Sequence, residues 1–280
     1  MAPSRGGNWW DETWNPVGGC KPASPGCRNC YAARLAATQH TSRQVPLYQD
    51  TADFRNEKPV FNGHLTALPA EHPEWVWPLK YSGADRPLLG PGQPSLIFVG
   101  SMTDIFHEDR PVADIDKVVD IITLSNHIGL LLTKRTQRLA EYFAAPQPEK
   151  MVRRWQQKLW LGFSAERQQE FDARWAHVRL LAERGYTVFV SVAPMLGPVR
   201  LPPDFLRHGR RAWTIASGEQ GRDARSMDAD WARALRDQCA AGVPFFLLQM
   251  AGRKPIPADL FVRQFPAVHV ADQSELGRVI

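Results

Sequence analysis

The stretch from Gly19 to Tyr31, GCKPASPGCRNCY, holds three of the four cysteines of the chain, spaced C-x6-C-x2-C. Its proline and glycine residues and its lack of an apolar run predict a loop. The aromatic segment 8–16 before it predicts a short strand. Residues 31–37 after it are good helix formers and predict a helix. The chain is therefore expected to open with a strand, a cysteine-rich loop and a helix.

Three clustered thiols cannot all pair in disulfides, so Cys20, Cys27 and Cys30 predict a metal site. They suit three irons of a 4Fe–4S cluster whose fourth iron stays open to another ligand. They also suit a zinc ion with a fourth ligand from elsewhere, for which His107 is the best candidate. His107 could instead shuttle protons or be an ordinary surface or capping residue. An ordinary loop with free thiols is the remaining alternative. Cys239 follows Leu235 by one helical turn and is expected in the core.

The composition fits an ordinary globular protein, with 280 residues, 44% hydrophobic and 22% charged. No apolar run is long enough for a membrane span, and Met1–Gly7 lacks the apolar region of a signal peptide, so we expect neither. Few cysteines outside the cluster favour a reducing cytosol and thus a cytoplasmic protein. The net charge of +5 permits a nucleic-acid partner without requiring one.

From residue 95 onward, short apolar runs alternate with helical patterns. Strands are expected at 96–99, 128–133, 159–163, 187–192, 212–216 and 243–248. Helices are expected at 114–125, 137–143, 164–185 and 228–241, with Ser164 and Asp228 as N-caps. Apolar strands separated by helices are typical of a parallel sheet covered on both faces.

These patterns predict an α/β fold: a partial or full (β/α) barrel of the TIM type, with about six to seven parallel strands. The whole chain, 1–280, is expected to form one domain. A segment at about 40–94, rich in proline and aromatic residues, is interpreted as an insertion after the first helix. Within it, Asn62-Gly63 predicts the turn of a small hairpin.

In such a barrel the functional site lies at the carboxyl ends of the strands. Polar residues follow the expected strands there: Ser101, Asp104, Lys134, Arg135, Ser164, Glu219 and Gln249. Ser101 and Asp104 suit an amine, Lys134 or Arg135 a carboxylate or phosphate, and Glu219 ribose hydroxyls. The basic stretch from Arg200 to Arg211 is either a solvated face or a nucleic-acid contact.

Several segments together resemble the phage-derived three-Cys-motif family, whose function is unassigned. They are Trp14–Pro16, Gly19–Cys20, Ser24–Ala32, Ser101–Glu108, Leu132–Arg135, Trp160–Gly162, Pro194–Val199, Ser217–Glu219, Leu235–Cys239 and Gly242–Phe246. The family is similar in layout to radical S-adenosylmethionine (SAM) enzymes. The resemblance implies a 4Fe–4S cluster on Cys20, Cys27 and Cys30 that reductively cleaves SAM to a 5′-deoxyadenosyl radical.

That radical would take a hydrogen atom from a nucleoside, nucleic-acid or small-metabolite substrate. Under this reading Asp104, Lys134 and Glu219 are the candidate catalytic residues, and Ser101, Asp104, Lys134, Ser164, Glu219 and Gln249 bind SAM. The electron donor would be a flavodoxin or a ferredoxin. Two rivals are a zinc-binding accessory protein that associates with nucleic acid and an iron–sulfur redox protein that never cleaves SAM.

The sequence also departs from these families. The commonest radical-SAM spacing is C-x3-C-x2-C, and the loop here is longer. Asn29, rather than an aromatic residue, precedes the third cysteine. Ala193 stands where the resembled family has Glu, and Ser217 and Gln220 stand where it has Gly and Ser. The Ala193 change could remove an acid from the site or mark a different substrate, and together the changes predict a divergent member with its own chemistry.

Overall fold

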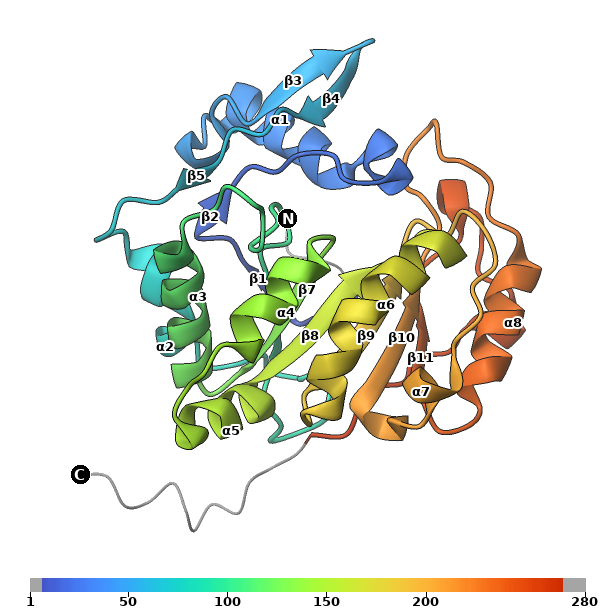
Figure 1. Cartoon of the computed structure of the whole chain (residues 1–280). Coiled ribbons are helices and arrows are strands. Elements are labelled where there is room, and N and C mark those ends of the chain that lie inside the picture. Colours follow the sequence, from blue (N-terminus) through green and yellow to red (C-terminus); the bar gives the residue numbers. More distant parts are fainter. Residues whose placement is uncertain (1–6, 269–280) are drawn as a thin grey trace.

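The computed structural model describes residues 7–268, apart from the side chains at 40–43 and 253. Residues 1–6, on which the expectation of no signal peptide largely rests, lie outside that part. The main sheet has seven strands, all parallel, in the order β1-β6-β7-β8-β9-β10-β11 (Figure 1). They are β1 (Glu12–Trp14), β6 (Leu96–Val99), β7 (Ile128–Thr133), β8 (Leu159–Ser164), β9 (Thr187–Val192), β10 (Ala212–Ala216) and β11 (Phe245–Leu247).

The strands lie side by side in the order in which the chain makes them, as in a (β/α) barrel. Within the described residues β1 and β11 remain the two edges of the sheet and do not pair with each other. The predicted α/β fold is therefore confirmed in its partial-barrel form. The first strand is shorter than the predicted 8–16, because Trp9 turns inward and packs on Phe98 with ring centroids 4.9 Å apart.

Helices cover the outer face of the sheet (Figure 1). They are α3 (Val112–Leu124), α4 (Thr136–Ala144), α5 (Glu149–Lys158), α6 (Gln168–Glu183), the short α7 (Pro203–Leu206) and α8 (Ala229–Cys239). The sequence did not predict α5, because most of its residues are charged or polar and Trp155 is its one buried side chain. None of the helices in residues 7–268 is long and apolar enough to cross a membrane.

Two predicted helix caps have different outcomes. Asp228 caps α8 as expected, because its side chain accepts a hydrogen bond from the backbone N–H of Asp230 at 2.9 Å. The prediction for Ser164 is wrong: this residue ends β8, and α6 begins at Gln168 after Arg167. Ser164 is thereby left at the carboxyl edge of the sheet.

The inner face of the sheet is filled mainly by aromatic side chains. Phe98, Trp160, Phe189, Trp213 and Phe246 belong to one buried cluster there. Alternate residues of the same strands face outward and pack against the helices. Gly162 is required on the inner face, because a side chain at this position would overlap the ring of Phe189. Both faces are therefore buried, which explains why the strands read as continuous apolar runs.

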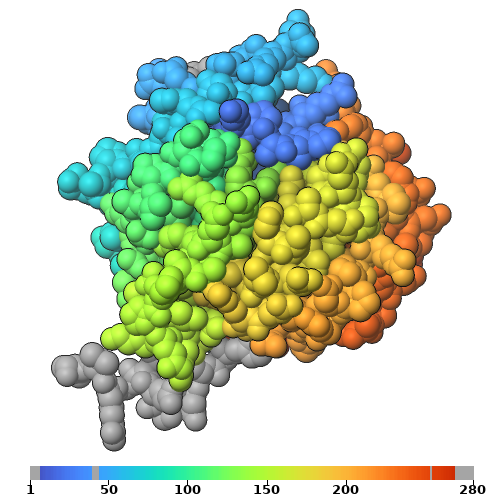
Figure 2. All heavy atoms as spheres, in the orientation of Figure 1, coloured from blue at the N-terminus to red at the C-terminus, as the bar shows by residue number. Residues whose placement is uncertain are grey.

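The insertion follows α1 (Tyr31–Arg43) and packs around the cysteine loop. It contains the antiparallel hairpin β3 (Ala52–Arg55) and β4 (Lys58–Phe61), the strand β5 (Thr66–Ala67), which pairs with β2 (Val17–Gly18), and the helix α2 (Trp77–Lys80). Figure 2 shows the N-terminal part of the chain, blue to cyan, as a layer over the green and yellow segments. That the whole chain forms a single domain stays a prediction.

The predicted hairpin turn at Asn62-Gly63 is wrong. The turn is Asn56-Glu57, whose φ values of 49° and 62° give the two left-handed residues of a tight two-residue hairpin. Asn62 instead donates from its side chain to the Asp50 carbonyl and to the Asp53 carboxylate, each at 2.9 Å. Asn62 therefore stabilises the chain just after β4 rather than the turn of the hairpin.

The substitution Phe189→Ala tests the inner core. Phe189 is fully buried, so removing its ring should lower the free energy of unfolding by about 3–5 kcal/mol, because transfer and cavity costs add. The matched control is Phe54→Ala on the hairpin, where the side chain is 64% exposed and the change should stay within about 0.5 kcal/mol. Urea denaturation of both variants checks this, and equal losses would contradict the assigned core.

Candidate functional site

The cysteine loop lies across the carboxyl edge of the sheet (Figure 1). Gly19 forms a bridge with Thr103, just after β6, and the Thr103 hydroxyl donates to the Gly19 carbonyl. Gly19 has a φ of +84°, and a side chain there would overlap the His64 carbonyl, so glycine is required before Cys20. The loop continues through a short 3₁₀ helix, Pro25–Asn29, to Cys30 at the start of α1. The insertion holds it from behind, since the Gly63 N–H donates to the Cys20 carbonyl at 3.0 Å.

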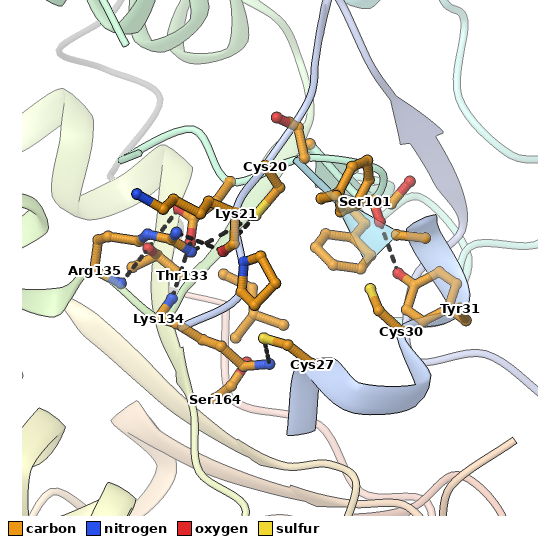
Figure 3. A pocket seen from close by; sticks show the side chains of 18 residues that line it. Cys20, Lys21, Cys27, Cys30, Tyr31, Ser101, Thr133, Lys134, Arg135 and Ser164 are labelled. Atoms are coloured by element: carbon orange, nitrogen blue, oxygen red, sulfur yellow. Dashed lines mark hydrogen bonds and ion pairs between the residues drawn. The ribbon is translucent and has the colours of Figure 1, made fainter. Parts of the chain in front are cut away.

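Cys20, Cys27 and Cys30 line a single pocket, here called the thiol pocket (Figure 3). Two cationic side chains from the end of β7 reach the sulfurs: Lys134 Nζ lies 3.5 Å from Cys27 Sγ, and Arg135 Nη1 lies 3.6 Å from Cys20 Sγ. Across residues 7–268, no three His, Cys, Asp or Glu side chains are grouped closely enough to hold one metal ion. The thiols converge on one space without closing around a single point.

The three thiols have different affinities for protons. Burial, with the nearby Asp104 carboxylate, raises the pKa of Cys20 to about 12, against the opposing effect of Arg135. Burial also raises the pKa of Cys30. For Cys27 the same burial is outweighed by Lys134 and by hydrogen bonds from Ala23 and Ser24, so the pKa falls below its usual value. Cys27 is therefore the thiol most readily present as a thiolate.

A buried carboxylate, Glu166, fixes Lys134 beside Cys27. Glu166 is fully buried and accepts from Ser24 Oγ at 2.6 Å, Lys134 Nζ at 3.1 Å and Arg174 Nη1 at 3.0 Å. Burial would raise the pKa of Glu166, but the two cations hold it below its usual value. Gly26 presses on this carboxylate so closely that no side chain fits there.

Asp104 joins the ends of β6 and β7. Its Oδ1 accepts from the Thr133 hydroxyl at 2.6 Å and from the Phe106 N–H at 3.1 Å. Its Oδ2 accepts from the Lys134 N–H and from Arg135 Nη1, both at 3.1 Å. Since both oxygens are occupied, this geometry fits a residue that positions Lys134 and Arg135. The predicted contact of Asp104 with a ligand amine stays a prediction.

A second pocket adjoins the thiol pocket and shares Cys30, Tyr31, Lys134 and Ser164 with it. It extends over the inner face of the sheet, where Glu219 and Gln249 line it. Glu219 accepts from Arg225 Nε and from Asn29 Nδ2, both at 3.0 Å, and these partners outweigh burial and lower its pKa. Gln249 Nε2 donates to the Gly218 carbonyl at 3.2 Å.

The structure therefore brings all the predicted ligand-binding residues to two connected pockets. Ser101 lines the thiol pocket, where its hydroxyl bonds to the side chain of Asn15 and its carbonyl accepts from Tyr31 Oη at 2.7 Å. Ala193, which stands where the resembled family has Glu, lines the second pocket, so this difference in sequence alters the lining of the cavity. The roles assigned to these residues stay predictions.

Other candidates lie away from both pockets. His107 is fully buried, accepts from the Asp109 N–H through Nδ1 at 3.2 Å and lines neither pocket. Arg210 and Arg211 precede β10 and so lie at the amino edge of the sheet, opposite the cysteine loop. Cys239 is buried in α8, as predicted. Sequence reasoning missed Glu166, whose one signal was its position just after β8.

The substitution Glu166→Gln tests the buried ion cluster. It leaves Lys134 and Arg174 without their counter-charge and should cost about 3–5 kcal/mol of the free energy of unfolding. Glu149→Gln, which breaks an exposed pair with Arg153, should leave the free energy of unfolding almost unchanged, because solvent screens that pair. Urea denaturation at neutral pH measures both changes.

The same variant makes a prediction about pH. The pKa of Glu166 is below its ordinary value of 4.5, so its stabilisation is complete above about pH 4.5 and is lost as the pH falls through the lowered pKa. The stability difference between wild type and Glu166→Gln should therefore shrink in acid. A difference that stays constant or grows would contradict an ionised Glu166.

Comparisons with known proteins identify a family and a distant structural likeness. A spore photoproduct lyase mutant is 14% identical, with a TM-score of 0.48, over 84% of this chain and 75% of that one. Spore photoproduct lyase complexed with dinucleoside spore photoproduct is 13% identical, with a TM-score of 0.48, over 83% of this chain and 74% of that one. A mutant of the lyase with bound AdoMet and dinucleoside spore photoproduct is 14% identical, with a TM-score of 0.47, over 85% of this chain and 76% of that one.

These structures share too little sequence with the present chain to define its chemistry, which depends on its own side chains. No curated protein matches the sequence. A family model matches residues 6–272 and bears on neither a phage origin nor a substrate. The chain belongs to the family described as protein of unknown function, DUF5131.

Proposed function

We propose that this protein is a radical-SAM-type enzyme, in which Cys20, Cys27 and Cys30 hold a 4Fe–4S cluster and SAM binds beside it. The observation that carries the proposal is the convergence of three thiols on one pocket, with no free fourth protein ligand among the described residues that line it. Asp104 also lines that pocket, but both of its oxygens are already hydrogen-bonded. Three thiolates with an open position suit a cluster that binds a further ligand at its fourth iron.

The residues present fit such a cluster better than a single zinc ion. Ligands of one tetrahedral ion must crowd around a point, whereas the thiolates of a cluster bind separate irons and stand further apart. The three thiols lie around one space in the thiol pocket (Figure 3), and none of the described residues that line it is a His that could complete a zinc site. The candidate fourth zinc ligand, His107, does not line the thiol pocket.

The chain's own residues would prepare the thiolates. Lys134 and Arg135 place positive charge against Cys27 and Cys20, and hydrogen bonds to cluster sulfurs tune the cluster's reduction potential. Glu166 keeps Lys134 in place, and Asp104 does the same for Arg135. When bound, the cluster would supply the electron that cleaves SAM to a 5′-deoxyadenosyl radical, which then takes a hydrogen atom from the substrate.

The second pocket is the proposed place for SAM and substrate. Lys134 and Ser164 line both pockets and would bind SAM where they meet, and Ser101 would bind it from the thiol pocket. Both oxygens of Glu219 already accept hydrogen bonds, from Arg225 and Asn29, so ribose hydroxyls would have to replace one of these donors or add to them. Gln249 would bind through its side-chain amide. A nucleoside, a nucleic acid or a small metabolite is the proposed substrate class, and a reducing cytoplasm suits the free, partly buried thiols.

The test starts from protein purified without oxygen and reconstituted with iron and sulfide. The wild type should be brown, hold about four irons per chain and form 5′-deoxyadenosine when SAM and dithionite are added. Cys27→Ala should lose both the colour and the product. Cys239→Ala is the matched control, because Cys239 is buried in α8 away from the pockets, and it should behave as the wild type.

The two rival functions give different results in the same assay. A colourless protein that holds zinc would identify a zinc site and overturn the proposal. A brown protein that forms no 5′-deoxyadenosine would identify an iron–sulfur protein that does not cleave SAM. Equal iron in Cys27→Ala and Cys239→Ala would show that the loop is not the ligand set.

A further inference from the structure

A basic groove lies on the outer side of the cysteine loop. One wall is the 3₁₀ helix with Cys27 and Arg28, and the other is the β3–β4 hairpin with Arg55 and Lys58. Arg55 and Lys58 are direct cross-strand partners, so both project from the same face of the hairpin. The groove thus gathers three cationic side chains next to one of the three thiols.

Two of these cations carry unbalanced charge. Lys58 Nζ pairs with Asp223 at 2.9 Å and reaches Asn29 Oδ1 at 3.4 Å. Arg28 and Arg55 are exposed, and neither has an acidic partner among the residues that the structure describes. The groove therefore presents a net positive surface to solvent, and an anionic partner is the complement that it fits.

Cys27 connects this surface with the thiol pocket. It lines both the groove and the thiol pocket, whereas Cys20 and Cys30 line the thiol pocket but not the groove. The groove shares no residue with the second pocket, so ligands bound there would leave it uncovered. A protein seated in the groove would consequently approach the thiolates through Cys27 while SAM and substrate occupy the other side.

We propose that this groove docks a small acidic electron-transfer protein that carries a flavin or an iron–sulfur group. The inference rests on the proposed function, which needs one electron from outside. In that step the donor is oxidised by one electron and the cluster is reduced by one, and no proton or group moves. Electron-transfer complexes are typically small and weak and rely on complementary charge, which matches a compact groove with two free arginines.

The same groove fits nucleic acid less well. Proteins that bind nucleic acid strongly neutralise several phosphates along a track of cations. Here two arginines are unpaired, and the third cation is already held by Asp223. No aromatic side chain lines the groove to stack on a base.

The test measures binding rather than turnover. The reconstituted protein is immobilised, and the association of an acidic flavodoxin, in its oxidised form, is followed at low and at high salt. Reversing two charges with Arg28→Glu and Arg55→Glu together should slow association about tenfold or more and flatten its salt dependence. The matched control reverses two exposed arginines at the opposite edge of the sheet, Arg210→Glu and Arg211→Glu, and should bind as the wild type.

Two further measurements keep the result decisive. Iron content and dithionite-driven 5′-deoxyadenosine formation are measured on the same preparations and separate the two proposals. A wild type that holds no iron and forms no 5′-deoxyadenosine would refute the proposed enzyme, whereas the binding assay alone decides the docking groove. If the double variant holds less iron than the wild type, the binding of the single variant Arg55→Glu decides the docking surface, because Arg55 is on the hairpin and outside the cysteine loop. Equal binding by both double variants, or binding of a single-stranded oligonucleotide but not flavodoxin, would overturn the docking surface.

Discussion

The Glu166 carboxylate, buried between Lys134 and Arg174, is the contact on which the site depends. A buried charge is tolerated when it is paired and fully hydrogen-bonded, and Glu166 meets this condition with two cations and the Ser24 hydroxyl. These partners come from the cysteine loop, the end of β7 and α6. One side chain therefore ties the loop to the sheet and presents Lys134 to Cys27. The absence of a side chain at Gly26 is what lets the loop approach so closely.

The insertion contributes to the site as well. Its strand β5 pairs with β2 beside the loop, and Gly63 binds the Cys20 carbonyl. The hairpin adds a second wall outside the loop, so the thiols are framed by the sheet on one side and by the insertion on the other. The insertion residue Phe61 shares one buried cluster with Ala33 of α1 and with Met102 after β6.

Much of the fold could be predicted from sequence because buried parallel strands leave a clear signal. The runs 96–99, 128–133 and 187–192 are mainly apolar, and each is a strand with those bounds. The helix α5 was missed because it buries only Trp155. The common location of the ligand-binding candidates could be predicted because strand ends in a barrel meet at one edge, whereas their roles stay predictions. Glu166 was missed since a carboxylate next to a strand end gives no sign that two distant cations will enclose it.

The second pocket has a property that follows from its paired charges. Among the described residues that line it, the charged ones are Lys134 and Glu219, and each already has a counter-ion, Glu166 and Arg225. A molecule entering this cavity meets oriented dipoles from serine and glutamine side chains rather than net charge. Selectivity would then come from the directionality of hydrogen bonds, so analogues that lack a single hydroxyl or amide would be discriminated against most strongly.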